Sequence, residues 1–206
     1  MSRLEPAVIL ILLAALSVSS FRRNYAWEDE LTLWADVALK SPGEARPHNN
    51  LGSALMKAGR YDEAALAIKS AIKADPYYIE PHYNMGIAYI RTGRLDDAVP
   101  ELLEVVRIDA FLKTGHFGAA AMPRYEMEAH SNLGNIYNTK GMFKEAVSHY
   151  REALKIEPDD AGTRFNLALT YKQAGQIDEA VREFEEVLRL NPADEGARWN
   201  ISVLKK

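Results

Sequence analysis

A sixteen-residue pattern that occurs four times constrains this chain more than any other feature. The stretch NNLGSALMKAGRYDEA at 49–64 has near-copies at 83–98, 131–146 and 165–180. The copies are 34 residues apart, except between the second and the third, where the step is 48. A repeat of this length forms one supersecondary unit that cannot bury its apolar side chains alone. The pattern therefore predicts stacked copies of one unit.

Each copy predicts two helices joined by a tight turn. Apolar residues spaced three and four apart give each helix one apolar stripe. A small residue in the first helix lets the second approach closely, a glycine ends the first helix, and an aspartate begins the second, where it complements the helix dipole. The small residues are Gly52, Gly86, Gly134 and Ala168. The glycines are Gly59, Gly93, Gly141 and Gly175, and the aspartates are Asp62, Asp96 and Asp178.

Nine recurring positions in each copy resemble the tetratricopeptide repeat (TPR). In the first copy they are Leu51, Gly52, Leu55, Gly59, Tyr61, Ala64, Ile68, Ala71 and Pro76. The resemblance covers residues 45–194 apart from one insertion. It implies an all-α protein, a right-handed α-solenoid of about four helix hairpins. We expect copies 1 and 2 at 45–112 and copies 3 and 4 at 127–194.

The chain on either side of the repeats is expected to cap the solenoid, because an open end would expose its core. Residues 22–44 read as a half-repeat with a capping helix at 27–40. Residues 195–206 restart the pattern and predict a second capping helix. The apolar stripe of the first capping helix is Trp27, Leu31, Trp34 and Ala38.

The longer step between the second and third copies places an insertion at 113–126, with the sequence KTGHFGAAAMPRYE. Either the second helix of copy 2 runs on, or a loop bulges from one face. Surface loops tolerate such additions at small cost. The functional alternative is a loop that contacts a partner, since loops often carry function.

The first residues differ in character from the repeats. Residues 6–21, PAVILILLAALSVSSF, carry no charge. The run is shorter than the roughly 20 apolar residues of a spanning helix. We therefore expect residues 1–21 to be a signal peptide or a short hydrophobic membrane anchor. Either would place the repeats outside the cytoplasm, in a periplasm or lumen, although Arg22 and Arg23 weaken that orientation.

The segment that follows resembles the junction in multi-spanning membrane proteins that carry an extracytoplasmic TPR tail. The matching residues are Arg23, Asn24, Trp27, Leu33, Trp34, Ser41, Pro42, Arg46, Asn50, Leu51 and Gly52. Some of those proteins have a sugar-transferring membrane part. This chain lacks that part, so the resemblance implies no transferase activity here.

One asparagine holds the same place in every copy and is the sharpest candidate for function. In TPR folds this position looks into the concave groove. A column of amides, which donate and accept hydrogen bonds, suits the backbone of an extended peptide, and the TPR-bearing glycosyltransferases use a similar ladder. The alternative is that these amides bond only within their own hairpins. The column is Asn50, Asn84, Asn132, Asn166 and Asn200, and Tyr83, Asn135, Lys57 and Arg91 complete the predicted groove.

Several functions are disfavoured by the same sequence. The net charge of −4 argues against nonspecific nucleic-acid binding, and a chain without cysteine has no thiolate chemistry. His48, His82 and His130 lie about one repeat apart, so they predict packing and no metal site. No catalytic triad, phosphate loop or zinc spacing occurs. We therefore expect no enzyme, cofactor or metal.

The sequence favours a non-catalytic scaffold that binds a peptide or protein partner in its groove and reaches a membrane through residues 6–21. The alternative is an accessory or detached part of a membrane glycosyltransferase system that presents substrate to it.

Overall fold

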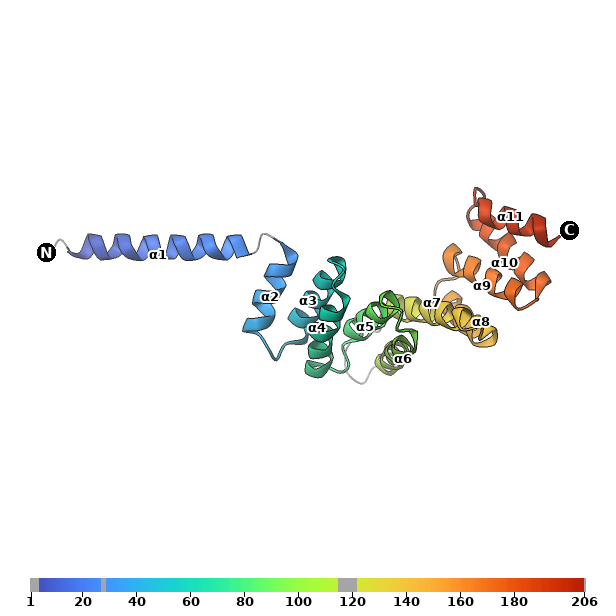
Figure 1. The fold of residues 1–206 in the computed structure, drawn as a ribbon, viewed down its shortest axis with the longest axis horizontal. Helices are drawn as coiled ribbons and strands as arrows, with labels where there is room; N and C mark the ends of the chain where they lie inside the picture. Colours follow the sequence, from blue (N-terminus) through green and yellow to red (C-terminus); the bar gives the residue numbers. More distant parts are fainter. Residues whose placement is uncertain (1–3, 27–28, 115–121, 206) are drawn as a thin grey trace. The chain divides into compact units, whose positions relative to one another are not determined.

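The computed structural model describes residues 4–26, 29–114 and 122–205, and all regular elements in those residues are α-helices. The helices form two compact units, Met1–Pro76 and Tyr77–Lys206. The first unit contains α1 (Leu4–Ala26), α2 (Glu30–Lys40), α3 (Ala45–Lys57) and α4 (Tyr61–Ala74). The second contains α5 (Ile79–Arg91), α6 (Leu95–Leu112), α7 (Pro123–Thr139), α8 (Phe143–Ile156), α9 (Ala161–Gln173), α10 (Ile177–Leu190) and α11 (Glu195–Leu204) (Figure 1).

In the first unit, α3 and α4 form a helix hairpin and α2 packs against α3. The expected capping helix is α2, which begins after Asp29. The Asp29 carboxylate accepts a hydrogen bond of 2.8 Å from the backbone N–H of Thr32 and so caps the helix. Of the predicted apolar stripe, Ala38 is buried, whereas Trp27 lies outside the described residues.

Helix α1 is one continuous helix of 23 residues (Figure 1). Its middle carries exposed apolar side chains, each more than half accessible: Val8, Ile9, Leu10, Ile11, Leu12, Leu13, Leu16 and Val18. Among residues 4–26, 29–114 and 122–205, no helix combines the length and the apolar content that crossing a membrane requires.

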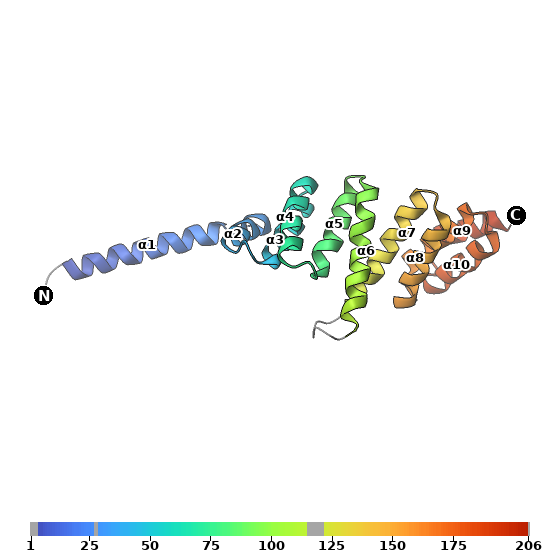
Figure 2. The ribbon, with the colours of Figure 1, turned by 90° about the horizontal axis from the view of Figure 1, so that it is seen from below.

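The second unit is a stack of helix hairpins (Figures 1 and 2). Helices pair as α5–α6, α7–α8 and α9–α10, and each hairpin packs onto the next through α6 against α7, α8 against α9 and α10 against α11. The apolar stripes meet in continuous cores between these helices. Side chains at the core centre are essentially inaccessible: Leu102, Val105, Ile108, Leu133, Tyr150, Leu167, Phe184 and Val187. The predicted all-α fold of stacked hairpins is confirmed.

The turn inside each hairpin has the predicted left-handed backbone. Gly59, Gly93, Gly141 and Gly175 have φ angles between 74° and 75°, a region that side chains with a Cβ rarely enter. The predicted close approach of the two helices is also present. A Cβ on Gly134 would lie 2.6 Å from carbons of the Tyr150 ring.

The insertion is partly helical. Helix α6 has 18 residues where α4, α8 and α10 have 14, and α7 has 17 where α3, α5 and α9 have 13. The fourteen additional residues thus include four in each of these two helices, with six in the connection between them. The first alternative, a second helix that runs on, accounts for only part of the insertion.

A buried carboxylate holds the two ends of the insertion together. The Asp109 side chain is inaccessible; one oxygen accepts a hydrogen bond of 2.5 Å from the backbone N–H of Met122, and the other lies 2.9 Å from the Lys113 Nζ. Lys113 also pairs with Glu126 at 2.5 Å. This hydrogen bond to Glu126 raises the pKa of Lys113. The end of α6 is therefore fixed to the start of α7 by charge and hydrogen bonds.

Candidate peptide-binding surface

The first helices of the hairpins in the second unit lie next to one another. Helix α7 contacts α5 on one side and α9 on the other. The asparagines that recur at one position of these helices and of α11 therefore lie on one side of the unit. We call this surface the first-helix face and define it by Tyr83, Asn132, Asn135, Asn166 and Asn200.

Between α5 and α7 the first-helix face is aromatic and acidic. The rings of Tyr83 and Tyr125 lie 5.2 Å apart in a tilted arrangement. Burial raises the pKa of Tyr83 above its usual range, and a hydrogen bond to the Glu128 carboxylate adds to the shift. The phenol therefore stays neutral at physiological pH. The Asn132 Nδ2 donates to the carbonyl oxygen of Glu128 at 2.9 Å, within its own helix.

Between α7 and α9 the amides join neighbouring repeats directly. The Asn135 Oδ1 accepts one hydrogen bond from the Tyr150 hydroxyl (2.7 Å) and one from the Asn166 Nδ2 (3.1 Å). Asn135 is itself exposed, whereas Asn166 is half-buried. One turn further along, the Thr170 hydroxyl lies 3.1 Å from the Asn138 Oδ1. These contacts fix the side chains of two adjacent repeats relative to each other.

Between α9 and α11 the column ends in a buried amide. Asn200 is only 4% exposed; its Nδ2 donates to the Gly196 carbonyl (2.9 Å) and its Oδ1 accepts from the Lys172 Nζ (2.8 Å). The same ammonium lies 5.2 Å from the ring centroid of Trp199, which is 61% exposed. A cation and an exposed aromatic side chain therefore mark this end of the face.

The predicted site residues divide between the two units. Asn84, half-buried on α5, is on the same helix as Tyr83, and Arg91 is exposed at the end of that helix. Asn50 and Lys57 belong to α3 of the first unit, where Lys57 pairs with Glu30 at 2.6 Å.

The sequence interpretation missed the second row of polar contacts, made by Asn138, Thr170 and Lys172. The available signal was their spacing, because Asn138 follows Asn135 by three residues and Thr170 follows Asn166 by four, which places each pair on one helix face.

Within residues 4–26, 29–114 and 122–205, no group of three or more His, Asp or Glu side chains could hold a metal ion.

Models of repeat families match most of the helical hairpins. Tetratricopeptide repeat models match residues 37–111 and 161–194, and a TPR repeat model matches residues 134–175. The helix pairs of this chain are tetratricopeptide repeats. The TPR hairpins predicted from the nine recurring positions are thereby confirmed.

Solved TPR structures share this fold at low sequence identity. The chain is similar to YrrB, described as a TPR protein with an unusual peptide-binding site, with a TM-score of 0.68 and 18% identity over 83% of this chain and 81% of that one. It is similar to MamA from Desulfovibrio magneticus RS-1, with a TM-score of 0.65 and 20% identity over 78% and 83% of the two chains. The chain is also similar to a chain of the APC/C Cut9–Hcn1 hetero-tetramer, with a TM-score of 0.69 and 17% identity over 84% of this chain and 32% of that one.

A curated relative matches a shorter part of the chain. Protein O-mannosyl-transferase Tmtc2 of Drosophila melanogaster is 41% identical over 66 residues, which is 32% of this chain. The chain spans only 7% of the length of that relative. The resemblance of the segment after residue 22 to the junction of multi-spanning membrane proteins therefore stays a prediction.

Proposed function

We propose that the chain is a non-catalytic TPR scaffold that binds an extended peptide or a protein segment along its first-helix face. The observation that carries the proposal is the Asn135–Asn166 contact, because it places amides of two adjacent repeats side by side on an accessible surface. An extended peptide presents N–H and C=O groups along its length, which amides can satisfy. YrrB, which shares the fold, is described as having a peptide-binding site.

A preformed surface of this kind lowers the cost of binding. The Asn135 side chain is already held by Tyr150 and Asn166, so little side-chain entropy is lost when a partner contacts it. The exposed Trp199 would supply an apolar anchor, the type of side chain that dominates the energy of many interfaces.

The experiment is a peptide-array selection with the full chain, followed by fluorescence polarisation on the peptides that bind. We expect the double variant Asn135→Ala with Asn166→Ala to weaken binding about thirtyfold, since two hydrogen bonds of about 1 kcal/mol each support it. The control is Asn191→Ala, an exposed amide outside this face. Unchanged affinity in the double variant, with its fold intact by circular dichroism, would refute the proposal.

We further propose that residues 6–21 bring the protein to a membrane and that the repeats lie on the extracytoplasmic side. The exposed apolar side chains of α1 support this, because six consecutive large side chains at 8–13, with Leu16 and Val18, would favour transfer from water to lipid. Flotation on liposomes compares the full chain with a form lacking residues 1–21, which should stay unbound. N-terminal sequencing of the membrane fraction then separates a retained anchor from a cleaved signal.

A second candidate function is an accessory role in a membrane glycosyltransferase system. The 41% identity to part of protein O-mannosyl-transferase Tmtc2 favours it, although the match covers 66 residues only. Chemical crosslinking in intact membranes is the test. Repeated recovery of a sugar transferase would support this role, and recovery of unrelated partners alone would count against it.

A further inference from the structure

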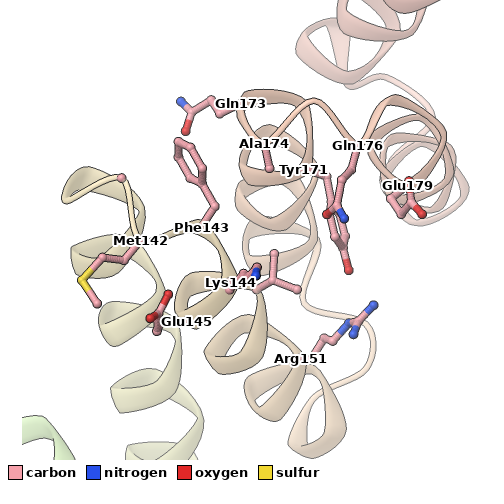
Figure 3. A pocket seen from close by; sticks show the side chains of 12 residues that line it. Met142, Phe143, Lys144, Glu145, Arg151, Tyr171, Gln173, Ala174, Gln176 and Glu179 are labelled. Carbon is pink, nitrogen blue, oxygen red and sulfur yellow. The ribbon is translucent and has the colours of Figure 1, made fainter.

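A cleft of about 690 Å³ lies between the third and fourth TPR hairpins, away from the residues of the first-helix face. Its walls are the first nine residues of α8, the end of α9 and the start of α10. Apolar and aromatic groups line part of it: Phe143 and Val147 from α8 and Tyr171 from α9 (Figure 3). The cleft can therefore accept an apolar side chain.

Two positively charged side chains of α8 line this cleft. Lys144 and Arg151 are exposed and seven residues apart, which is two helical turns and hence the same side of α8. Arg151 reaches toward Tyr171, and its guanidinium carbon lies 5.8 Å from the centroid of that ring (Figure 3). In the described residues neither cation has a carboxylate within ion-pair distance, whereas nearby Lys140 and Lys155 are both paired, with Asp96 and Glu152.

Two acidic residues, Glu145 and Glu179, also line the cleft, and neither forms an ion pair with Lys144 or Arg151. Glu179 is engaged by Arg182 at 3.4 Å. Glu145 points away from Tyr171, on the other side of α8 from Arg151 (Figure 3). The space between α8 and the α9–α10 pair therefore combines apolar walls with two available positive charges.

The other repeats show that these cations are not required by the fold. The positions equivalent to Lys144 hold Asp62, Asp96 and Asp178 in the other three copies. An aspartate is the favourable residue in the first turn of a helix, and a lysine there opposes the helix dipole. The equivalents of Arg151 are Lys69, Leu103 and Glu185. The third repeat thus departs from the pattern at Lys144, against the preference of its own helix, whereas position 151 varies among the repeats.

We propose that this cleft is a second binding site, which takes an acidic peptide segment with an aromatic or large aliphatic side chain. The apolar side chain would enter between Phe143, Val147 and Tyr171, and flanking carboxylates would pair with Lys144 and Arg151. Charge complementarity selects this occupant over a basic or neutral segment. The site is separate from the first-helix face, so the chain would hold two partner segments at once.

The test uses the full chain and a fluorescein-labelled peptide with one Phe between two pairs of Asp, measured by fluorescence polarisation. We expect saturable binding, and about tenfold weaker binding when Asn replaces every Asp or when Ser replaces the Phe. The double variant Lys144→Ala with Arg151→Ala should lose about tenfold in affinity. The matched control, Lys205→Ala with Arg189→Ala, removes one lysine and one arginine from exposed sites that do not line the cleft, and should bind as the unchanged protein does.

Three results would overturn the proposal: no saturable binding, equal affinity for the Asp and Asn peptides, or equal losses in the two double variants, which would indicate nonspecific attraction. A change of oligomeric state in the Lys144→Ala, Arg151→Ala variant, measured by sedimentation, would instead assign the cleft to a second copy of the chain. Lys144→Asp restores the residue of the other repeats, so it should weaken binding while preserving the helix. Asn135→Ala with Asn166→Ala should leave this binding unchanged, which separates a failure here from a failure of the first-helix face.

Discussion

The third and fourth TPR hairpins place different chemistry at the same contact between their two helices. In the fourth, Arg164 of α9 pairs with Glu183 of α10 at 3.0 Å. In the third, the equivalent residues are His130 of α7 and His149 of α8, and their Nδ1 atoms lie 2.9 Å apart. Both contacts join residues 19 apart in the chain. The hairpin geometry is therefore maintained by an ion pair in one repeat and by two imidazoles in the other.

The same two hairpins also differ at the close approach of their helices. The third uses Gly134 against Tyr150, whose hydroxyl donates to Asn135. The fourth uses Ala168 in the equivalent place, and its Phe184 packs edge-to-face with Phe165 at 5.4 Å. The third repeat thus depends on hydrogen bonds and on neutral histidines, whereas the fourth depends on apolar packing and an ion pair.

The largest expected effect is that of Gly134→Ala. Its new methyl would lie 2.6 Å from the Tyr150 ring, so overpacking should cost about 3 kcal/mol of unfolding free energy. Alanine has the higher helix propensity, worth about 1 kcal/mol in the opposite direction, so the net loss should be about 2 kcal/mol. The matched change, Ala168→Gly, should cost about 1 kcal/mol through propensity, and loss of the buried methyl group adds to that cost. Urea unfolding measures both, and a Gly134→Ala protein more stable than the parent would show that the ring moves freely.

The next largest effect is expected for substitutions in the connections that precede the third and fourth hairpins. Lys113→Met leaves the inaccessible Asp109 carboxylate without its cation, and we expect a loss of about 1.5 kcal/mol, less than for a fully buried pair because Lys113 is 45% exposed. Before the fourth hairpin, Asp160→Ala removes a helix cap and should cost about 1 kcal/mol. Urea unfolding distinguishes them. Adding Asp109→Leu to Lys113→Met should recover stability, and a further loss would argue against a buried-charge penalty.

A smaller effect is expected for Tyr150→Phe. The change removes the hydrogen bond to Asn135 and keeps the ring, so it should cost about 1 kcal/mol. Burial raises the pKa of Tyr150 to about 12, so the parent phenol is neutral and donates at physiological pH. The variant should also weaken peptide binding on the first-helix face, because Asn135 loses a fixed partner. Fluorescence polarisation tests this, and unchanged affinity would mean that Asn166 alone positions the amide.

The smallest expected effect is a pH dependence confined to the third hairpin. Burial lowers the pKa of His130, and burial together with the neighbouring His130 lowers that of His149. The unfolded chain, with an ordinary pKa near 6.5, binds more protons below that pH, so stability should fall as the pH drops below about 6.5. Glu152, Lys113 and Lys155 also act on this pair. Hydrogen exchange at pH 7.5 and 5.5 should show more opening in α7–α8 than in α9–α10.

The control for the pH effect is His149→Phe, which retains an aromatic ring against Tyr137, whose ring stacks on His149 at 5.3 Å. This variant should lose the part of the pH dependence that His149 contributes, while the buried His130 keeps its own part. An equal response in parent and variant would place the titrating group elsewhere.

Much of the fold could be predicted because each copy of the repeat has the same residue types at the positions that determine its structure. The glycine at a positive φ and the small residue at the helix crossing leave few alternatives, so Gly141 and Gly134 were interpretable from spacing alone. The division of the insertion was not predictable, since it depends on two contacts across the connection, from the Met122 N–H to Asp109 and from Lys113 to Glu126. No sequence pattern records a pairing of that kind.

The candidate site was predictable by position but less so by contact. Spacing placed Asn132 and Asn166 on one side of their helices, yet Asn132 bonds to its own helix backbone and Asn166 reaches the neighbouring repeat. Asn200 occupies the same phase and is buried. The side-chain rotamer and the neighbouring residues decide whether such an amide bonds to its own helix, bonds to the next repeat or is buried. The spacing of residues in the sequence predicts neither.

The side-chain oxygen of Asn135 accepts two hydrogen bonds, which determines what this side chain can offer a ligand. Both acceptor lone pairs of an amide oxygen are used when two donors, here Tyr150 and Asn166, reach it. What the exposed side chain offers outward is its NH₂ group alone. A ligand passing this point must therefore bring a carbonyl or carboxylate, which fixes the register in which a main chain can run across these two repeats.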